Sequence, residues 1–377
     1  MSARDAREWD DDRWARAVIT SVFPADGSVS RAVADHGAPA ALQEMLQRRD
    51  GAAECLARMP WLAGRETLAA RMAALPLPCE LLVPGDRAWP VAVDDLAEPP
   101  VALWVLGAAG AAALTPASIA VVGARAATSY GVRVATNISA DIAAAGWSVV
   151  SGGAFGVDAA AHRGALTAGT TTCVLACGVD IAYPAAHRDL IAHIARAGAV
   201  VSEVGLGQPA RRYHFLARNR IIAAMTRGTV LVEAAHRSGS LSTARSALEL
   251  CRQVMAVPGP VTSAMSAGVH ELIRTVPDVH LVTCAGHVLE LCESVGTGLL
   301  ELPHGPRDAR DSLSADAARL IDHLGTAGMT AAGAAAAAQL SLPRAQAALA
   351  ELQVAGLAAI TAQGWALTKQ GAAPSPR

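Results

Sequence analysis

The chain has 377 residues, more than one domain usually holds, so we expect two or three domains with at least one large core. Hydrophobic residues make up 52% of the sequence, and the formal net charge is -2. A charge so close to zero excludes a protein that coats nucleic acid by bulk positive charge. Any nucleic-acid site is therefore expected to be a local patch.

The seven cysteines are scattered and have no Cys-x-x-Cys spacing, which predicts reduced, mostly buried thiols and no metal site. Residues 1–14 are rich in Asp and Arg and contain no apolar signal region, which favours a cytoplasmic protein. Residues 99–124 carry no charge, but Pro116 and two glycines divide them. We expect two buried strands there, near 101–106 and 119–122, and no membrane span.

Residues 1–75 show a helical pattern interrupted by turn signals, and predict an N-terminal helical domain. Beyond residue 119, short β-type runs alternate with helical stretches of about a dozen residues. This alternation predicts an α/β domain over residues 76–300, with a doubly wound, mostly parallel sheet. The expected strands lie near 119–123, 147–151, 171–176, 199–203, 229–233, 253–257 and 279–282.

Residues 301–311 have the composition of a linker. Residues 312–377 then predict three helices, a hairpin and a disordered tail from residue 370, which is typical of a winged-helix-like domain. The three expected helices are Ala315–Leu324, Thr330–Leu340 and Pro343–Ala355.

Ligands of a doubly wound sheet bind outside the carboxyl ends of its strands, where most glycine and polar clusters of this domain fall. The segment Ser151–Asp158 predicts a strand end, a tight glycine turn and a helix start. Such a helix start offers exposed N–H groups to a phosphate, and the alternative is an ordinary turn. Arg125, after an earlier strand, is placed to meet a backbone phosphate or to form a structural salt bridge.

The strongest concentration of positive charge is the stretch 211–220, with four arginines, a histidine, two aromatic rings and no acid. Arginines bind phosphates and aromatic faces stack on unpaired bases, so this composition is typical of a single-strand groove. The alternative is a solvated surface run. If a helix starts at Ala217, Arg218 and Arg220 diverge by about 200°. We then expect one of them to meet the ligand and the other to hold the fold against Glu233.

Aromatic residues support the same site. Four of the six Phe and Tyr residues are expected in loops at this edge: Phe155, Tyr183, Tyr213 and Phe215. The alternative is a role in core packing. No Gly-x-Gly-x-x-Gly or P-loop motif follows a strand, so no nicotinamide, flavin or ATP cofactor is expected.

The carboxylates at this edge favour structural roles. Asp158 and His162 are spaced i, i+4 on one helix face, a geometry that serves acid–base chemistry, but no nucleophile accompanies them. We expect Asp158 to complement the helix dipole and to orient His162. Glu203 and Glu233 end two strands, and we interpret them as partners of the arginines rather than as a hydrolytic pair.

Taken together and in order, these motifs resemble the DNA-processing protein A family (DprA, also called Smf) over about residues 80–290. Two positions depart from the family pattern: His270 stands where Asn is usual, and Ala185 begins a loop where a basic residue is common. The motifs that carry the resemblance are Val122–Arg125, Ser151–Asp158 with His162, Gly178 with Tyr183-Pro184, Ser202-Glu203, Phe215–Arg220, Glu233 with Ser238–Ser240, and Pro258-Gly259.

The resemblance implies an extended Rossmann-like domain in a cytoplasmic homodimer. It also implies that the protein binds and protects single-stranded DNA in natural transformation, helps to load the recombinase RecA, and is not an enzyme. The residues expected to bind the strand are Gly123, Arg125, Ser151, Gly152, Gly153, Phe155, Gly156, Arg211, Phe215, Arg218, Asn219, Arg220, Ser238, Gly239 and Ser240.

Two other functions compete with this one. The fold and glycine loops are also similar to nucleotide-hydrolysing phosphoribohydrolases, in which Gly-Gly-x-Gly-Thr precedes a catalytic Glu. The corresponding stretch 239–245 of this chain has no such acid, and the next one is Glu249. A regulator acting through the winged helix is the other alternative, but its third helix offers only Arg344 against Glu351, too little charge for phosphate contacts.

Overall fold

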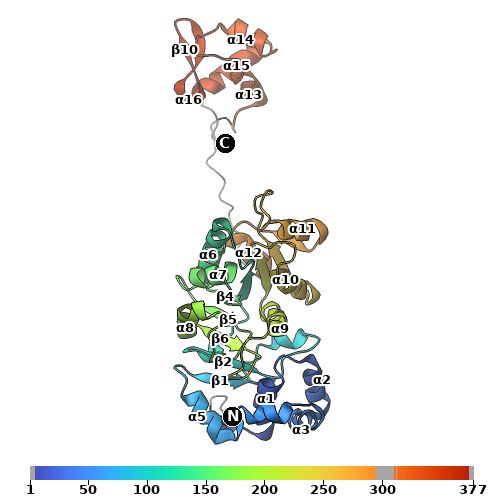
Figure 1. Cartoon of the computed structure of the whole chain (residues 1–377). Coiled ribbons are helices and arrows are strands. Elements are labelled where there is room, and N and C mark those ends of the chain that lie inside the picture. The colour runs from blue at the N-terminus through green and yellow to red at the C-terminus, as the bar shows by residue number, and fades with distance from the viewer. Residues whose placement is uncertain (1–4, 294–309, 311, 373–377) are drawn as a thin grey trace. The chain divides into compact units, whose positions relative to one another are not determined.

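The computed structural model describes residues 5–293, 310 and 312–372. It divides into two compact units, residues 1–299 and 300–377, and each is described here by itself (Figure 1). The domain boundary predicted near residue 75 lies inside the first unit. Apart from Arg310 and residues 370–372, the predicted linker and tail lie outside the described residues.

Within the described part of the first unit, nine strands form one sheet in the order β1-β2-β6-β5-β4-β3-β7-β8-β9. The strands are β1 (Cys79–Leu82), β2 (Leu103–Leu106), β3 (Ser118–Val122), β4 (Ser148–Ser151), β5 (Thr171–Val174), β6 (Ala199–Ser202), β7 (Gly228–Leu231), β8 (Gln253–Ala256) and β9 (Val279–Leu281). The helices are α1 (Asp11–Val22), α2 (Gly27–His36), α3 (Ala38–Arg48), α4 (Ala52–Ala57), α5 (Arg65–Ala73), α6 (Ser129–Ala144), α7 (Val157–Ala165), α8 (Arg188–Ala197), α9 (Arg212–Ala224), α10 (Ser240–Glu249), α11 (Ala267–Thr275) and α12 (Ala285–Cys292).

The winding of the sheet reverses at β3. From β3 the chain adds β4, β5 and β6 on one side, and then returns to place β7, β8 and β9 on the other side. The strands from β3 to β9 run parallel to one another, and the antiparallel pairs of this sheet are β1–β2 and β2–β6. The predicted doubly wound, mostly parallel α/β sheet is confirmed. The point where β3 meets β7 is therefore the switch point of the sheet.

Alternate residues of each strand face opposite layers of the core. In β3, Ile119 and Val121 pack with α6, α7 and α12, whereas Ala120 and Val122 pack with α9, α10 and α11. Figure 1 shows these two groups of helices on opposite sides of the sheet. Both faces of the central strands are thus buried, which explains why their sequences are continuous apolar runs.

The N-terminal helices share a core with the antiparallel end of the sheet. Trp104 of β2 is fully buried, and its ring centroid lies 6.3 Å from that of Trp9. The Trp104 indole N–H donates to Thr20 Oγ1 of α1 over 3.0 Å. Because this core is continuous, residues 5–75 and the sheet form one unit.

The second unit contains α13 (Ala315–Ile321), α14 (Ala331–Ala337), α15 (Leu342–Val354), the hairpin strands β10 (Ala358–Thr361) and β11 (Gly364–Leu367), and α16 (Lys369–Ala372). The three predicted helices and the hairpin are confirmed, and the short α16 occupies the start of the predicted tail. On α15, Arg344 donates to both carboxylate oxygens of Asp316 over 2.7 Å.

The remaining structural expectations concern the uncharged stretch and the cysteines. Residues 99–124 form β2 and β3 with a short helical turn between them, as predicted. Among the helices that the structure describes, none has the length and apolar character needed to cross a bilayer. All seven cysteines are free, and four of them are buried.

His162 of α7 lies in the core of the first unit, fully buried. The expectation that Asp158 orients this ring is wrong, because His162 Nδ1 lies 2.8 Å from Thr171 Oγ1 at the start of β5. Burial, together with the nearby positive charge of Arg218, lowers the pKa of His162 to about 3. The imidazole is therefore neutral in the folded protein.

This burial predicts a pH-dependent stability. Below the ordinary pKa of about 6.5, the unfolded chain protonates His162 and the folded chain does not, so stability is lost as the pH falls toward the folded pKa of about 3. His162→Gln should remove about 1.4 kcal/mol of this loss per pH unit below about pH 6. Urea unfolding of both proteins from pH 7 to 4.5 measures the difference, and parallel stability curves would contradict it.

Candidate nucleic-acid interface

A cleft of about 620 Å³ opens at the switch point, at the carboxyl ends of β3 and β7. It is lined by the loops after β3 and β7, by Ala154 of the glycine turn with Asp158 of α7, by one face of α9 and by the start of α10. Of the predicted strand-binding residues, the cleft brings together Gly123, Arg125, Phe215, Arg218, Asn219, Ser238, Gly239 and Ser240.

Glu233 fixes the loop that carries Arg125. Its buried carboxylate accepts from Thr128 N over 2.8 Å and from Thr128 Oγ1 over 2.6 Å, at the N-cap of α6. Its backbone carbonyl accepts from Ala124 N over 2.7 Å. The expected pairing of Glu233 with an arginine of α9 is therefore wrong, because the carboxylate is used to anchor α6. Arg125 lies between these two anchor points and remains exposed.

Arg218, a buried arginine of α9, packs against the glycine turn that precedes α7. Arg218 is 6% exposed, and its Nη1 donates to Val174 O at the end of β5 over 2.8 Å. A side chain at Gly152 would overlap this guanidinium, so glycine is required there. Burial lowers the pKa of Arg218, and nearby Asp158 opposes that shift.

The backbone N–H groups of the glycine turn were expected to be exposed to a phosphate. They donate instead to the side chain of Asp158. Its Oδ2 accepts from Gly152 N over 3.2 Å and from Ala154 N over 3.4 Å. Burial raises the pKa of Asp158, while Arg218 and these hydrogen bonds lower it. The N–H groups of the turn are therefore already paired with an internal carboxyl group.

Other predicted residues of this turn face inward as well. Ser151 is fully buried and donates to Val121 O over 2.7 Å. Gly153 and Gly156 have φ of 67° and 77°, which glycine adopts without strain. None of these three residues lines the cleft, and only Ala154 of the turn does so.

Helix α9 begins at Arg212, five residues before the expected start, after the extended N-cap Arg211. Tyr213 and Phe215 therefore lie in its first turns, which corrects the expectation that they lie in loops. The Arg125 guanidinium lies 5.1 Å from the centroid of the Phe215 ring, a cation–π contact. Tyr183, from the loop after β5, packs against the Phe215 ring, and the two ring centroids lie 5.6 Å apart.

Arg220 holds the fold, as one arginine of the run was expected to do. Its Nη2 donates to the two carboxylate oxygens of Glu203 over 2.7 and 2.8 Å, and its Nη1 donates to Glu98 O. Burial raises the pKa of Glu203, and the Arg220 charge lowers it. Arg211 is exposed but does not line the cleft.

The start of α10 forms another wall of the cleft. Ser238 and Ser240 share a hydrogen bond of 2.7 Å between their hydroxyls, and Gly239 is the N-cap of the helix without a side-chain cap. Asn219 Nδ2 reaches across from α9 and donates to Ser242 Oγ over 2.8 Å. A helix start in this position favours a phosphate through its N–H groups and dipole.

Two cleft arginines were not predicted as binding residues. Arg212 follows Arg211 in the same run, and Arg237 precedes Ser238 in the loop after β7; both are exposed and line the cleft. The position of Arg237 in the loop after β7, beside the predicted Ser238, was an available signal. His270, which departs from the family pattern, does not line the cleft. Its Nε2 lies 3.1 Å from Gly259 O.

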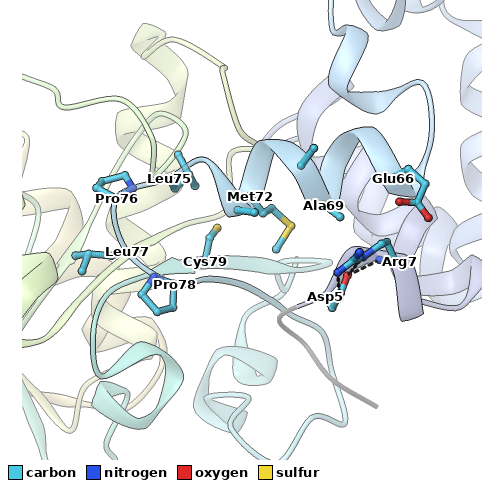
Figure 2. A pocket seen from close by; sticks show the side chains of 12 residues that line it. Asp5, Arg7, Glu66, Ala69, Met72, Leu75, Pro76, Leu77, Pro78 and Cys79 are labelled. Carbon is cyan, nitrogen blue, oxygen red and sulfur yellow. Dashed lines mark hydrogen bonds and ion pairs between the residues drawn. The ribbon is translucent and has the colours of Figure 1, made fainter.

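A second cavity, of about 540 Å³, lies between α5 and the chain leading into β1. Figure 2 shows its apolar wall of Met72, Leu75 and Leu77, and the Arg7–Asp5 ion pair at its edge. It contains no aromatic ring and shares no residue with the switch-point cleft. The switch-point cleft is therefore the candidate nucleic-acid interface.

The Arg218 contact predicts that Gly152→Ala is destabilising. The added methyl would displace a buried guanidinium, and overpacking of this kind costs about 1–3 kcal/mol of unfolding free energy. Gly239→Ala is a matched control at the same edge, because its φ is -63° and no atom lies within 4 Å of the new methyl. Urea unfolding measures both variants, and equal stabilities would contradict the packing described.

Comparison with known proteins places this architecture in a family. The family model for DNA recombination-mediator protein A matches residues 80–293. A Mycobacterium tuberculosis protein named for DNA processing, DprA, is 41% identical over 305 residues, which is 78% of this chain and 78% of that protein. Protein Smf of Escherichia coli is 38% identical over 248 residues, 65% of this chain and 64% of its own length.

Two solved structures of DprA proteins are similar to this chain. The X-ray structure of DprA from Streptococcus pneumoniae superposes with a TM-score of 0.62 at 28% identity, over 75% of this chain and 98% of that one. The structure of DprA from Helicobacter pylori, a study of its single-stranded DNA binding mode, has a TM-score of 0.51 at 28% identity over 57% of this chain and 95% of that one. The protein described here therefore belongs to the DNA recombination-mediator protein A family, whose relatives carry the names DprA and Smf.

Proposed function

We propose that this protein binds single-stranded DNA in the switch-point cleft. The observation that carries the proposal is the pair formed by Arg125 and Phe215, which lie 5.1 Å apart and both line the cleft. An arginine that binds phosphate and a ring that stacks on a base are the two elements of a single-strand groove. The relative from Helicobacter pylori, whose structure concerns single-stranded DNA binding, supports this assignment.

The charge of the cleft fits a nucleic-acid backbone. Arg212 and Arg237 add two exposed cations to that of Arg125. Among the described residues that line the cleft, the only acid is Asp158, which is buried and hydrogen-bonded to the turn. A chain of net charge -2 thus concentrates positive charge where the groove lies.

Unpaired bases suit this cleft better than a duplex. A stacking ring needs the open face of a base, and in a duplex neighbouring base pairs cover both faces. The second unit offers little to a duplex, because Arg344, the one arginine of α15, is paired with Asp316. We propose that this unit is dispensable for strand binding.

Binding without hydrolysis is the function we propose, rather than that of a phosphoribohydrolase. Glu233 anchors α6, Glu203 is paired with Arg220, and Asp158 closes the glycine turn. These three carboxyl groups of the carboxyl edge are thus engaged by donors of the protein. Incubation with nucleoside monophosphates should release no free base, and a turnover rate above that of a heat-treated sample would contradict this.

The main prediction separates phosphate from base contacts. Arg125→Gln should reduce the slope of log K against log salt by about 0.7, since a phosphate contact releases counterions. Phe215→Leu should weaken binding by about 1–3 kcal/mol and leave the slope nearly unchanged. Anisotropy of a labelled oligonucleotide at several salt concentrations measures both quantities.

The control is Arg163→Gln, which removes an exposed arginine of α7 that does not line the cleft. It should leave affinity and slope as in the wild type. A slope that falls equally in Arg125→Gln and Arg163→Gln would mean that the strand responds only to total charge. A duplex of the same length that binds as tightly as the single strand would also overturn the proposal.

We also propose, from family membership, that the protein is a homodimer that protects single strands and helps to load RecA. Sedimentation should then give twice the chain mass of 38.4 kDa. RecA filament assembly on an oligonucleotide should be faster with the wild type than with an Arg125→Gln, Phe215→Leu double variant. Equal rates would separate strand binding from RecA loading, and a monomer mass would contradict the dimer.

A further inference from the structure

One aromatic ring at the carboxyl edge lies outside the cleft. Phe155 is 47% exposed in the turn between β4 and α7, and it does not line the cleft, whereas its neighbour Ala154 does. Adjacent Cα atoms are about 3.8 Å apart, so the backbone of Phe155 lies directly beside a residue that lines the cleft. The exposed ring leaves an aromatic face open to a ligand.

The Phe155 ring is held in place by a buried histidine. The ring centroids of Phe155 and His187 lie 4.5 Å apart, tilted by 59°. His187 is buried, and its Nδ1 lies 2.9 Å from Gly153 O, where a protonated Nδ1 donates to the carbonyl. Gly153 and Phe155 belong to the same turn. His187 therefore contacts both the backbone and the ring of the turn.

The surroundings of His187 favour stacking over phosphate binding. The next two residues, Arg188 and Asp189, are both exposed and carry opposite charges. They add no net charge beside the Phe155 ring. The feature that remains available to a ligand is the open face of the ring.

We infer that Phe155 is a second base-stacking subsite beyond the end of the cleft, and that His187 is its positioning residue. The inference rests on the proposed function, because it requires a strand in the cleft. A strand with one base on Phe215 that leaves the cleft past Ala154 brings a later base to Phe155. The ligand is an unpaired nucleotide of any base, because every base has a π-face.

Oligothymidylates of increasing length test the subsite, with affinity measured for wild type, Phe155→Leu and Phe215→Leu. Phe155→Leu should weaken binding of long strands about tenfold and leave the shortest bound strand unchanged, with an unchanged salt slope. Phe215→Leu should weaken strands of every length. Val91→Ala, a change at an exposed residue of the amino edge, is the control and should have no effect.

The outcomes separate the two proposals. If Phe215→Leu weakens binding and Phe155→Leu has no effect at any length, the subsite is wrong and the cleft assignment stands. If neither variant weakens binding, the proposed function itself fails. A loss in Phe155→Leu that is equal for short and long strands places the ring inside the first site and contradicts the subsite.

The role of His187 is tested by a double-mutant cycle. His187→Asn removes the ring but keeps a side-chain N–H, and it should weaken long strands several-fold while sparing the shortest one. In the Phe155→Leu background the same change should have no further effect on affinity. Melting curves accompany each variant. A loss of affinity that is additive in the two backgrounds would show that His187 acts only through overall stability.

Discussion

The carboxyl edge of this molecule depends on a buried guanidinium. Removing an arginine side chain from water costs several kcal/mol unless its charge and donors are satisfied. Arg218 offsets part of that cost with the hydrogen bond to the Val174 carbonyl and the nearby carboxyl group of Asp158, whereas its buried Nε–H has no hydrogen-bond partner. The guanidinium lies where Gly152 leaves space. One side chain of α9 thereby contacts both the end of β5 and the glycine turn before α7.

The arginines at the carboxyl edge of the sheet form two groups with different roles. Arg218 and Arg220 are bound to protein groups, so their conformations are fixed. Arg125, Arg212 and Arg237 are exposed and line the cleft. Fixed arginines preorganise the surface, and exposed ones keep their donors available to a ligand. This division explains how a nearly neutral chain presents a locally basic groove.

Much of the fold could be predicted from the sequence, because buried parallel strands are continuous apolar runs that end in polar turns. Each expected strand from 119 to 282 lies within two residues of its position in the structure. The roles of single polar residues could not be predicted in the same way. The partners of Arg218, Arg220 and Glu233 lie 17 to 122 residues away, and only the pairing order of the strands brings them together. The start of α9 was misplaced because Arg211, at its N-cap, is not a residue type that typically marks one.

The closed glycine turn has a consequence for the choice of ligand. Asp158 supplies the acceptor oxygen that a nucleotide phosphate would bring to this turn in a mononucleotide-binding enzyme. A free nucleotide therefore finds no phosphate cradle in the glycine turn. A polymer spanning several contacts gains from each of them without losing its freedom of translation again. Under the proposed function, such a surface would select long strands over the mononucleotides of a cell, which would otherwise compete for it.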